Sequence, residues 1–137
     1  MKTLIIYYSY SGKTKRIAEA LAESESADIA EIKSVGRPVK LKVYTAGILA
    51  TFRNKAWPIQ PPDIDFSDYE RLILMSPVWA SNPPPYVTAM LEQLPEGKTV
   101  AVKMISASGK SECVARLEAA LKARNCTLEG VEDIKAG

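Results

Sequence analysis

Three uninterrupted apolar runs limit the folds open to this 137-residue chain. They are TLIIYY at 3–8, RLILMS at 71–76 and TVAVKMIS at 99–106. Runs that are apolar on both faces suit the central strands of a parallel sheet that helices cover on each side. The weaker, more polar segments 27–33 and 127–134 are expected to be outer strands of the same sheet.

Segments with helical periodicity alternate with these strands. Apolar residues recur one helical turn apart in each of them, and Ser111 is placed to cap the last one. The resulting β-α-β-α-β-α-β-α-β order predicts an α/β fold with a doubly wound, five-stranded parallel sheet. The length predicts a single domain over 1–137. The expected helical segments are 14–25, 43–55, 85–94 and 111–125.

Composition and charge exclude several classes of function. The chain has no histidine, which excludes Ser-His and Cys-His catalysis and His metal sites, and Cys113 and Cys126 match no zinc spacing. A net charge of +2 with scattered lysines argues against a nucleic-acid partner. No apolar run approaches about 18 residues, so no membrane association is expected and the predicted location is cytoplasmic.

In a doubly wound sheet, ligands bind beyond the carboxyl ends of the strands, where the strand order reverses. Here that edge consists of the loops 9–14, 76–85 and 106–111. The first loop, SYSGKT, ends like a nucleotide-triphosphatase P-loop. The glycine that such a loop needs five positions before Gly12 is Tyr7, and no Walker B aspartate follows the later strands, so that function is rejected.

The first loop still has the features of a phosphate site. Ser9, Ser11 and Thr14 offer three hydroxyls at a strand-to-helix junction, and the amides of a helix N-terminus favour an anion. Gly12 lets the backbone approach a ligand closely. The alternative is a plain helix cap with incidental serines.

The other two loops offer a ring-binding surface. Trp79 stands in the proline-stiffened loop SPVWASNPPPY, where its ring could stack on a planar heterocycle or simply close the edge of the core. The loop SASGKS has small residues that let backbone amides reach a ligand edge, although such a loop can also be a generic turn. A phosphorylated planar ring fits all three loops together.

These stretches resemble flavodoxin-like FMN-binding proteins, in particular short-chain flavodoxins. YYSYSGKTKRIAEALA is similar to the family's phosphate loop and first helix, and LILMSPVWASNPPPYVTAMLEQL to its third strand, flavin-contacting loop and next helix. The resemblance extends from Met1 to about Ile134. It implies a 2-1-3-4-5 strand order, bound FMN and electron transfer.

The resemblance also assigns residues to the cofactor, with no catalytic residue and no metal ligand. It implies that the first loop holds the phosphate and that the second and third loops enclose the isoalloxazine. The phosphate residues are Ser9, Ser11, Gly12, Lys13 and Thr14; the ring residues are Pro77, Val78, Trp79 and Ala80 on one side and Ser106, Ala107, Ser108 and Gly109 on the other; Tyr10 and Asn82 complete the expected set.

Three functions remain open. The first is an electron carrier between redox partner proteins, and the second is an FMN-dependent NAD(P)H:quinone-type reductase, which a Trp79 ring lying flat on the flavin would obstruct. The third is a binding module without a cofactor. The chain departs from the family in Lys13, where many members have Asn, and in its pI of about 8.5.

The helix that usually follows the fifth strand is also missing from the sequence. We therefore expect an open apolar face over strands three to five, covered by homodimerisation or by a neighbouring subunit.

Overall fold

The computed structural model describes residues 2–36, 43–60 and 62–136, and the elements below lie within these ranges. The strands are β1 (Lys2–Tyr7), β2 (Asp28–Glu31), β3 (Lys33–Ser34), β4 (Ile59–Gln60), β5 (Tyr69–Pro77), β6 (Thr99–Ser106) and β7 (Thr127–Lys135). The α-helices are α1 (Lys13–Glu25), α3 (Ile48–Phe52), α4 (Pro85–Gln93) and α5 (Val114–Ala123), accompanied by a π-helical turn η1 (Val43–Gly47) and a 3₁₀ turn η2 (Phe66–Asp68).

The main sheet has the predicted topology. Its strand order is β2-β1-β5-β6-β7 and every neighbouring pair is parallel. Numbered along the chain this is 2-1-3-4-5, so the doubly wound sheet is confirmed. The three long apolar runs form its centre, where Leu4, Ile73 and Met104 are at most 1% exposed, and the two polar segments form its edges.

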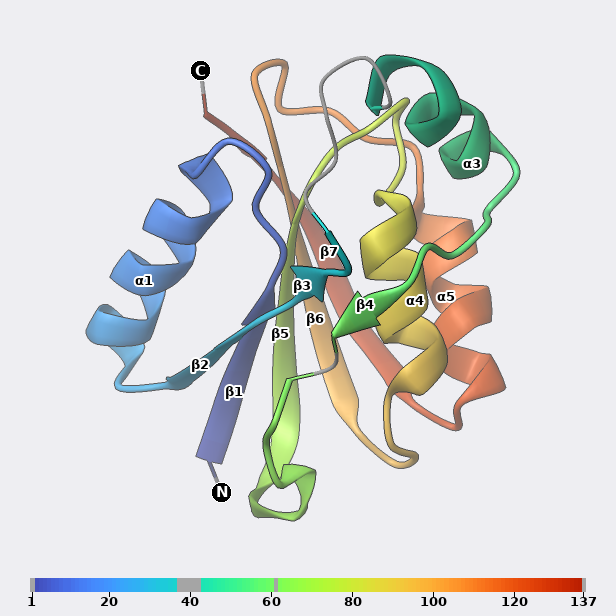
Figure 1. The fold of residues 1–137 in the computed structure, drawn as a ribbon. Coiled ribbons are helices and arrows are strands. Elements are labelled where there is room, and N and C mark those ends of the chain that lie inside the picture. Colours follow the sequence, from blue (N-terminus) through green and yellow to red (C-terminus); the bar gives the residue numbers. More distant parts are fainter. Residues whose placement is uncertain (1, 37–42, 61, 137) are drawn as a thin grey trace.

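The helices divide unequally between the two faces of the sheet. Helix α1 covers one face alone, and α3, α4 and α5 lie on the other side (Figure 1). This is the arrangement that right-handed crossovers require, because the chain moves one way across the sheet after β1 and the other way after β2. The core is correspondingly split into a large cluster under α4 and α5 and a smaller one under α1.

Two segments differ from the sequence prediction. The strand predicted over 27–33 ends at Glu31. The Ile32 N–H makes the last hydrogen bond to β1, with the Tyr7 carbonyl at 2.7 Å, and the chain then pairs β3 antiparallel with β4. The helix predicted over 43–55 ends at Phe52, and Asn54 adopts a left-handed φ of 54°, a common helix-ending conformation.

The predicted cap of the last helix is wrong. Cys113, not Ser111, occupies the N-cap position of α5. The Ser111 hydroxyl instead donates a 2.5 Å hydrogen bond to Asp133 Oδ1, which joins the loop after β6 to the edge strand β7. A hydrogen bond from Ser111 to a distant strand has therefore replaced the helix cap that the sequence predicted.

The face of β5, β6 and β7 beyond the reach of α1 is polar, so the expected apolar surface is wrong. Arg71 on β5 pairs with Glu129 on β7, and Lys103 on β6 pairs with Glu132 on β7. The large apolar side chains that are exposed in the described ranges lie elsewhere: they are Ile29, Val35, Leu49, Phe52 and Val114. Homodimerisation through this face stays a prediction without the apolar surface from which it was argued.

Helix α1 carries its charges against its own dipole. Lys13, Lys15 and Arg16 stand in its first turn, and Glu23 and Glu25 stand in its last turn. Cations near a helix N-terminus and anions near a C-terminus are each unfavourable by about 0.3–1 kcal/mol. Burial of Ala18 against the sheet, rather than charge placement, stabilises this helix.

Both cysteines are free and buried, at 1% exposure for Cys113 and 8% for Cys126. Among the described residues, no helix is long and apolar enough to span a membrane.

Candidate functional site

A cavity of about 200 Å³ lies where the three carboxyl-end loops meet. Each loop contributes residues that the sequence predicted, together with Ile105 at the end of β6 and Ala136 after β7. The predicted residues that line it are Tyr10, Ser11, Lys13, Thr14, Pro77, Val78, Trp79, Ser106 and Ala107.

The amino end of α1 presents unused donors to this cavity. No acidic side chain stands in its first turn and no side chain caps it, so its first amides and the positive end of its dipole remain available. Gly12, the N-cap residue, has a φ of 98°, a left-handed conformation that favours glycine. An anion in the cavity would meet the geometry that helix N-termini use for phosphate.

Thr14 lines the cavity with a side chain that is almost completely buried. The residue is only 3% exposed, and within the described ranges its hydroxyl has no hydrogen-bond partner. Nevertheless, no buried side-chain oxygen or nitrogen in those ranges is unpaired. The hydroxyl oxygen is therefore not fully enclosed, and it is free to donate to an oxygen bound beside it.

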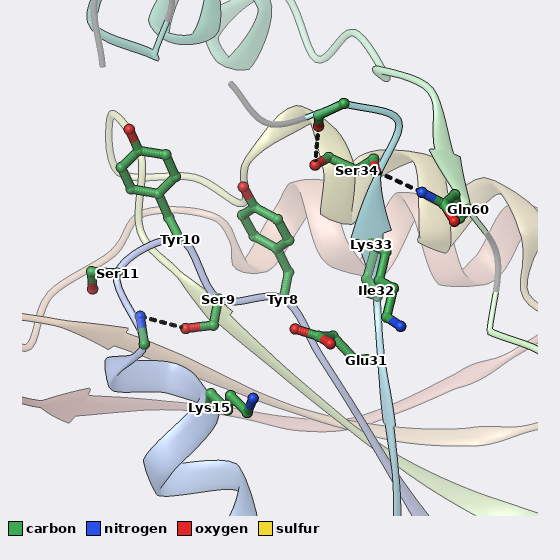
Figure 2. Close-up of a pocket in the computed structure, with 12 residues that line it drawn as sticks. Tyr8, Ser9, Tyr10, Ser11, Lys15, Glu31, Ile32, Lys33, Ser34 and Gln60 are labelled. Carbon is green, nitrogen blue, oxygen red and sulfur yellow. Dashed lines mark hydrogen bonds between the residues drawn. The ribbon is translucent and has the colours of Figure 1, made fainter. Parts of the chain in front are cut away.

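A second, larger cavity of about 630 Å³ flanks the first loop on the β2 side. It shares Tyr10 and Ser11 with the smaller cavity and is bordered by β3 and β4 (Figure 2). Ser9 and Gly12 line this cavity and not the smaller one, and the Gly12 N–H donates to Ser9 Oγ at 3.0 Å. The first loop thus separates two cavities and presents residues to each.

Trp79 is a core residue with one part at the site. Its ring is 9% exposed and packs edge-on against Tyr8, Tyr10 and Tyr86, with centroid distances of 6.2, 6.0 and 6.4 Å. Such edge-to-face contacts are a favoured aromatic arrangement. Of the two alternatives for this ring, closure of the core edge matches the structure, and an open stacking face does not.

The tyrosines packed around Trp79 carry no charge. Burial raises the pKa of the Tyr8 phenol well above its usual range, with smaller contributions from the neighbouring Tyr86 and Tyr10. Burial also raises the pKa of Tyr86. These phenols are therefore neutral hydrogen-bonding groups at physiological pH, and the cluster sets the wall of the site without adding charge.

The loop after β5 is held in a tight turn. Trp79 and Asn82 exchange two backbone hydrogen bonds of 2.9 Å, and Asn82 Nδ2 donates to the Ala80 carbonyl at 2.8 Å. Ala80 and Ser81 between them both have positive φ, 47° and 66°. Left-handed conformations cost non-glycine residues roughly 1 kcal/mol each. Ala80 and Asn82 shape this turn and do not line the small cavity.

The loop after β6 is fastened to the end of the chain. Ser106 Oγ accepts from the Gly109 N–H at 3.0 Å, and the Ala136 N–H donates to the Ser106 carbonyl at 2.8 Å. A side chain at Gly109 would meet Lys135 Cβ at 2.9 Å. Ser108 and Gly109 therefore hold the loop closed beside the cavity, and Ser106 and Ala107 face it.

The sequence missed Ile105 and Ala136 as lining residues. Ile105 precedes the predicted loop by one residue, so its strand alternation could have indicated it. No sequence signal places Ala136, because its position depends on the pairing of β7 with β6.

Comparison with known proteins shows which family this chain matches. The family model described as Flavodoxin matches residues 2–131. A flavoprotein from Lactobacillus acidophilus NCFM, solved in complex with FMN, is 28% identical with a TM-score of 0.80, over 95% of this chain and 91% of that one.

Two further proteins are also similar to this chain. A protein from Bacteroides eggerthii DSM 20697 shares the fold, with a TM-score of 0.79 and 19% identity over 96% of this chain and 86% of that one. An uncharacterised protein of Archaeoglobus fulgidus is 29% identical over 99 residues. That match covers 70% of this chain but only 60% of the Archaeoglobus protein's length.

Proposed function

Because the chain belongs to the flavodoxin family, we propose that it binds FMN and transfers electrons between redox partner proteins. The observation that carries the proposal is the cavity in which the three loops meet, with Thr14 and the positive end of α1 beside it. The similarity to the Lactobacillus flavoprotein supports FMN as the occupant.

The residues present fit this cofactor. Ser11, Thr14 and the first amides of α1 would bind the phosphate, since they are donors at the positive end of a helix dipole. Pro77, Val78 and Ala107 would enclose the ring with apolar surface. Lys13 is the charged residue of the lining within the described ranges, and it favours added negative charge.

Bound FMN would supply the redox chemistry, and the protein would bind, orient and shield it. No acid or base is required of the chain, which agrees with its lack of histidine. Trp79, Tyr8 and Tyr86 exclude water from the wall of the site. The free thiols of Cys113 and Cys126 support the expected cytoplasmic location, where thiols stay reduced.

The direct test is the visible absorbance of freshly purified protein, followed by heat extraction and chromatography of the released flavin. We expect FMN rather than riboflavin, because riboflavin lacks the phosphate that the first loop binds. Colourless protein that also fails to take up added FMN would leave the third alternative, a binding module without a cofactor.

The reductase alternative is favoured by one observation. The Trp79 ring is 9% exposed and packs against Tyr8 and Tyr86, so little of it is left to cover the flavin and obstruct a second substrate. Steady-state oxidation of NAD(P)H with a quinone separates the two functions. A carrier should show turnover only when a separate reductase is added.

A further inference from the structure

The small net charge of this protein conceals a strong separation of charge along the sheet. Exposed cations gather at the carboxyl ends of the strands, around the cofactor site, and exposed carboxylates gather at the opposite end. The cations, here called the basic end, include Lys13, Lys15, Lys33, Arg53, Lys55 and Lys110. The carboxylates, here called the acidic end, include Glu25, Asp28, Asp65, Asp68, Glu70 and Glu96, and they outnumber the cations Lys2, Lys98 and Lys122 at the same end.

The cations of the basic end are free to act outward. None of them makes a salt bridge within the described ranges, where the ion pairs are Arg71–Glu129 and Lys103–Glu132. Three carboxylates interrupt the basic end: the half-buried Glu31, the exposed Glu112 and the exposed Asp133, which accepts the Ser111 hydrogen bond. Lys15, Lys33 and Glu31 line the larger cavity in Figure 2, so this part of the basic end borders the first loop.

This charge pattern opposes the stability of the helix that carries part of it. Lys13 and Lys15 stand at the positive end of the α1 dipole, where a carboxylate would stabilise the helix. Helix α5 likewise has no acidic residue in its first turn. Local helix stability does not explain these cations, whereas attraction of an anion does; the cofactor phosphate accounts for Lys13 beside the small cavity but not for Lys33, Arg53, Lys55 and Lys110, which lie outside its lining.

The basic end also exposes apolar side chains. Leu49, Phe52 and Val114 are 50%, 66% and 51% exposed, and they belong to α3 and the first residue of α5. Arg116 fixes these two elements to each other, because its Nη1 donates to the Thr51 carbonyl at 2.6 Å. Apolar side chains surrounded by charge are typical of a protein interface.

We propose that the basic end is a docking surface for an acidic redox protein, and that its field steers that protein toward the cofactor site. The proposal rests on the proposed function for its redox component. It favours a protein over a nucleic acid, because phosphates would make no use of Leu49, Phe52 and Val114. It also predicts that the partner is negatively charged at its docking surface, which the net charge of +2 alone does not predict.

The first test uses one haem protein in two charge forms. Native cytochrome c is basic, and exhaustive succinylation makes it acidic. In stopped flow, the reduced flavin-loaded protein passes one electron to each ferric haem, which becomes ferrous. We expect the succinylated form to react about tenfold faster near 10 mM ionic strength, and the difference to vanish near about 500 mM. Faster reaction of the native form, or equal rates at low salt, would overturn the proposal.

Charge-reversal variants then show which part of the surface produces the attractive electrostatic field. Arg53→Glu combined with Lys55→Glu should remove most of the preference for the succinylated form. The matched control, Lys2→Glu combined with Lys122→Glu, changes the net charge equally but lies toward the acidic end, and it should retain the preference. Equal effects of both pairs would mean that overall charge, and not a docking surface, sets the rate.

A binding measurement makes the outcome independent of the flavin. Calorimetric titration of the protein, with or without FMN, should detect succinylated but not native cytochrome c at low salt. Phe52→Ser should weaken this binding without changing its salt dependence. Tighter binding of a DNA duplex or of phosphatidylserine vesicles at the same salt would assign the basic end to another class of partner. Failure to bind FMN with docking intact would overturn only the proposed function.

Discussion

Arg71 and Glu129 form two hydrogen bonds across the open face of the sheet, 2.9 Å from Nε to Oε1 and 2.8 Å from Nη2 to Oε2. They stand on β5 and β7, with β6 between them. The pair therefore lies over β6 beside Ala101 and bridges two strands that share no backbone hydrogen bonds.

A double-mutant cycle should measure this pair. We expect Arg71→Ala and Glu129→Ala to show a coupling free energy of about 0.5–1 kcal/mol at pH 7 in urea unfolding, because both side chains are about two-fifths exposed. The hydrogen bonds from Arg71 lower the pKa of Glu129 in the folded state. The coupling should therefore be complete above the unfolded pKa of about 4.3 and disappear as the pH falls through the folded pKa. A coupling that persists at low pH would contradict this assignment.

Thr14 provides the sharpest test of the phosphate site. Thr14→Val keeps the shape of the buried side chain and removes the hydroxyl, so FMN affinity should fall by about one to two decades through loss of a charge-assisted hydrogen bond. Riboflavin affinity should hardly change, and Thr14→Ser should retain FMN binding. Equal loss of both ligands in a fluorescence titration would remove Thr14 from the phosphate site.

Lys13 should raise the reduction potential of bound FMN. The Lys13→Glu variant should lower that potential by roughly 40 mV, which corresponds to about 1 kcal/mol of Coulomb energy for an exposed charge beside the cavity. Lys122→Glu makes the same change in net charge on α5, outside the cavity lining, and is the control. Spectroelectrochemistry with equal potentials in both variants would exclude a local effect of Lys13.

A substitution in the turn after β5 should stabilise the protein. Ser81 has a φ of 66° at the second position of a two-residue turn, where glycine is strongly preferred. Ser81→Gly should therefore raise the free energy of unfolding by about 0.5–1 kcal/mol. Ser81→Val, which adds β-branching to the same conformation, should lower it. Thermal unfolding followed by circular dichroism would decide, and a destabilised glycine variant would show that the turn is not strained.

The parallel sheet was predictable because burial on both faces leaves a direct record in the sequence. Leu4, Ile73 and Val102 are apolar whichever way they point, and each is at most 1% exposed. The division of helices between the faces followed from chain handedness alone. The apolar open face was wrong because the Arg71–Glu129 pair joins residues 58 positions apart. The residues next to Arg71 and Glu129 in the sequence do not indicate that the two will pair.

Some of the predicted site residues line the small cavity, and others lie beside it. Ser11, Thr14 and Val78 line the cavity, since the ends of adjacent parallel strands must meet. The orientation of Trp79 was not predictable, because it depends on Tyr8 and Tyr86 from other elements. Sequence spacing gives the neighbourhood of a side chain but not the direction of its ring.

The burial of both thiols gives this protein a practical use in labelling. Cys113 and Cys126 are both buried, which limits access of a reagent to either thiol, and burial also raises the pKa of the Cys113 thiol. A cysteine introduced at an exposed position such as Lys55 should then be the single rapid target of a maleimide dye. Fluorophores could be attached one at a time to the native background without first replacing either natural cysteine.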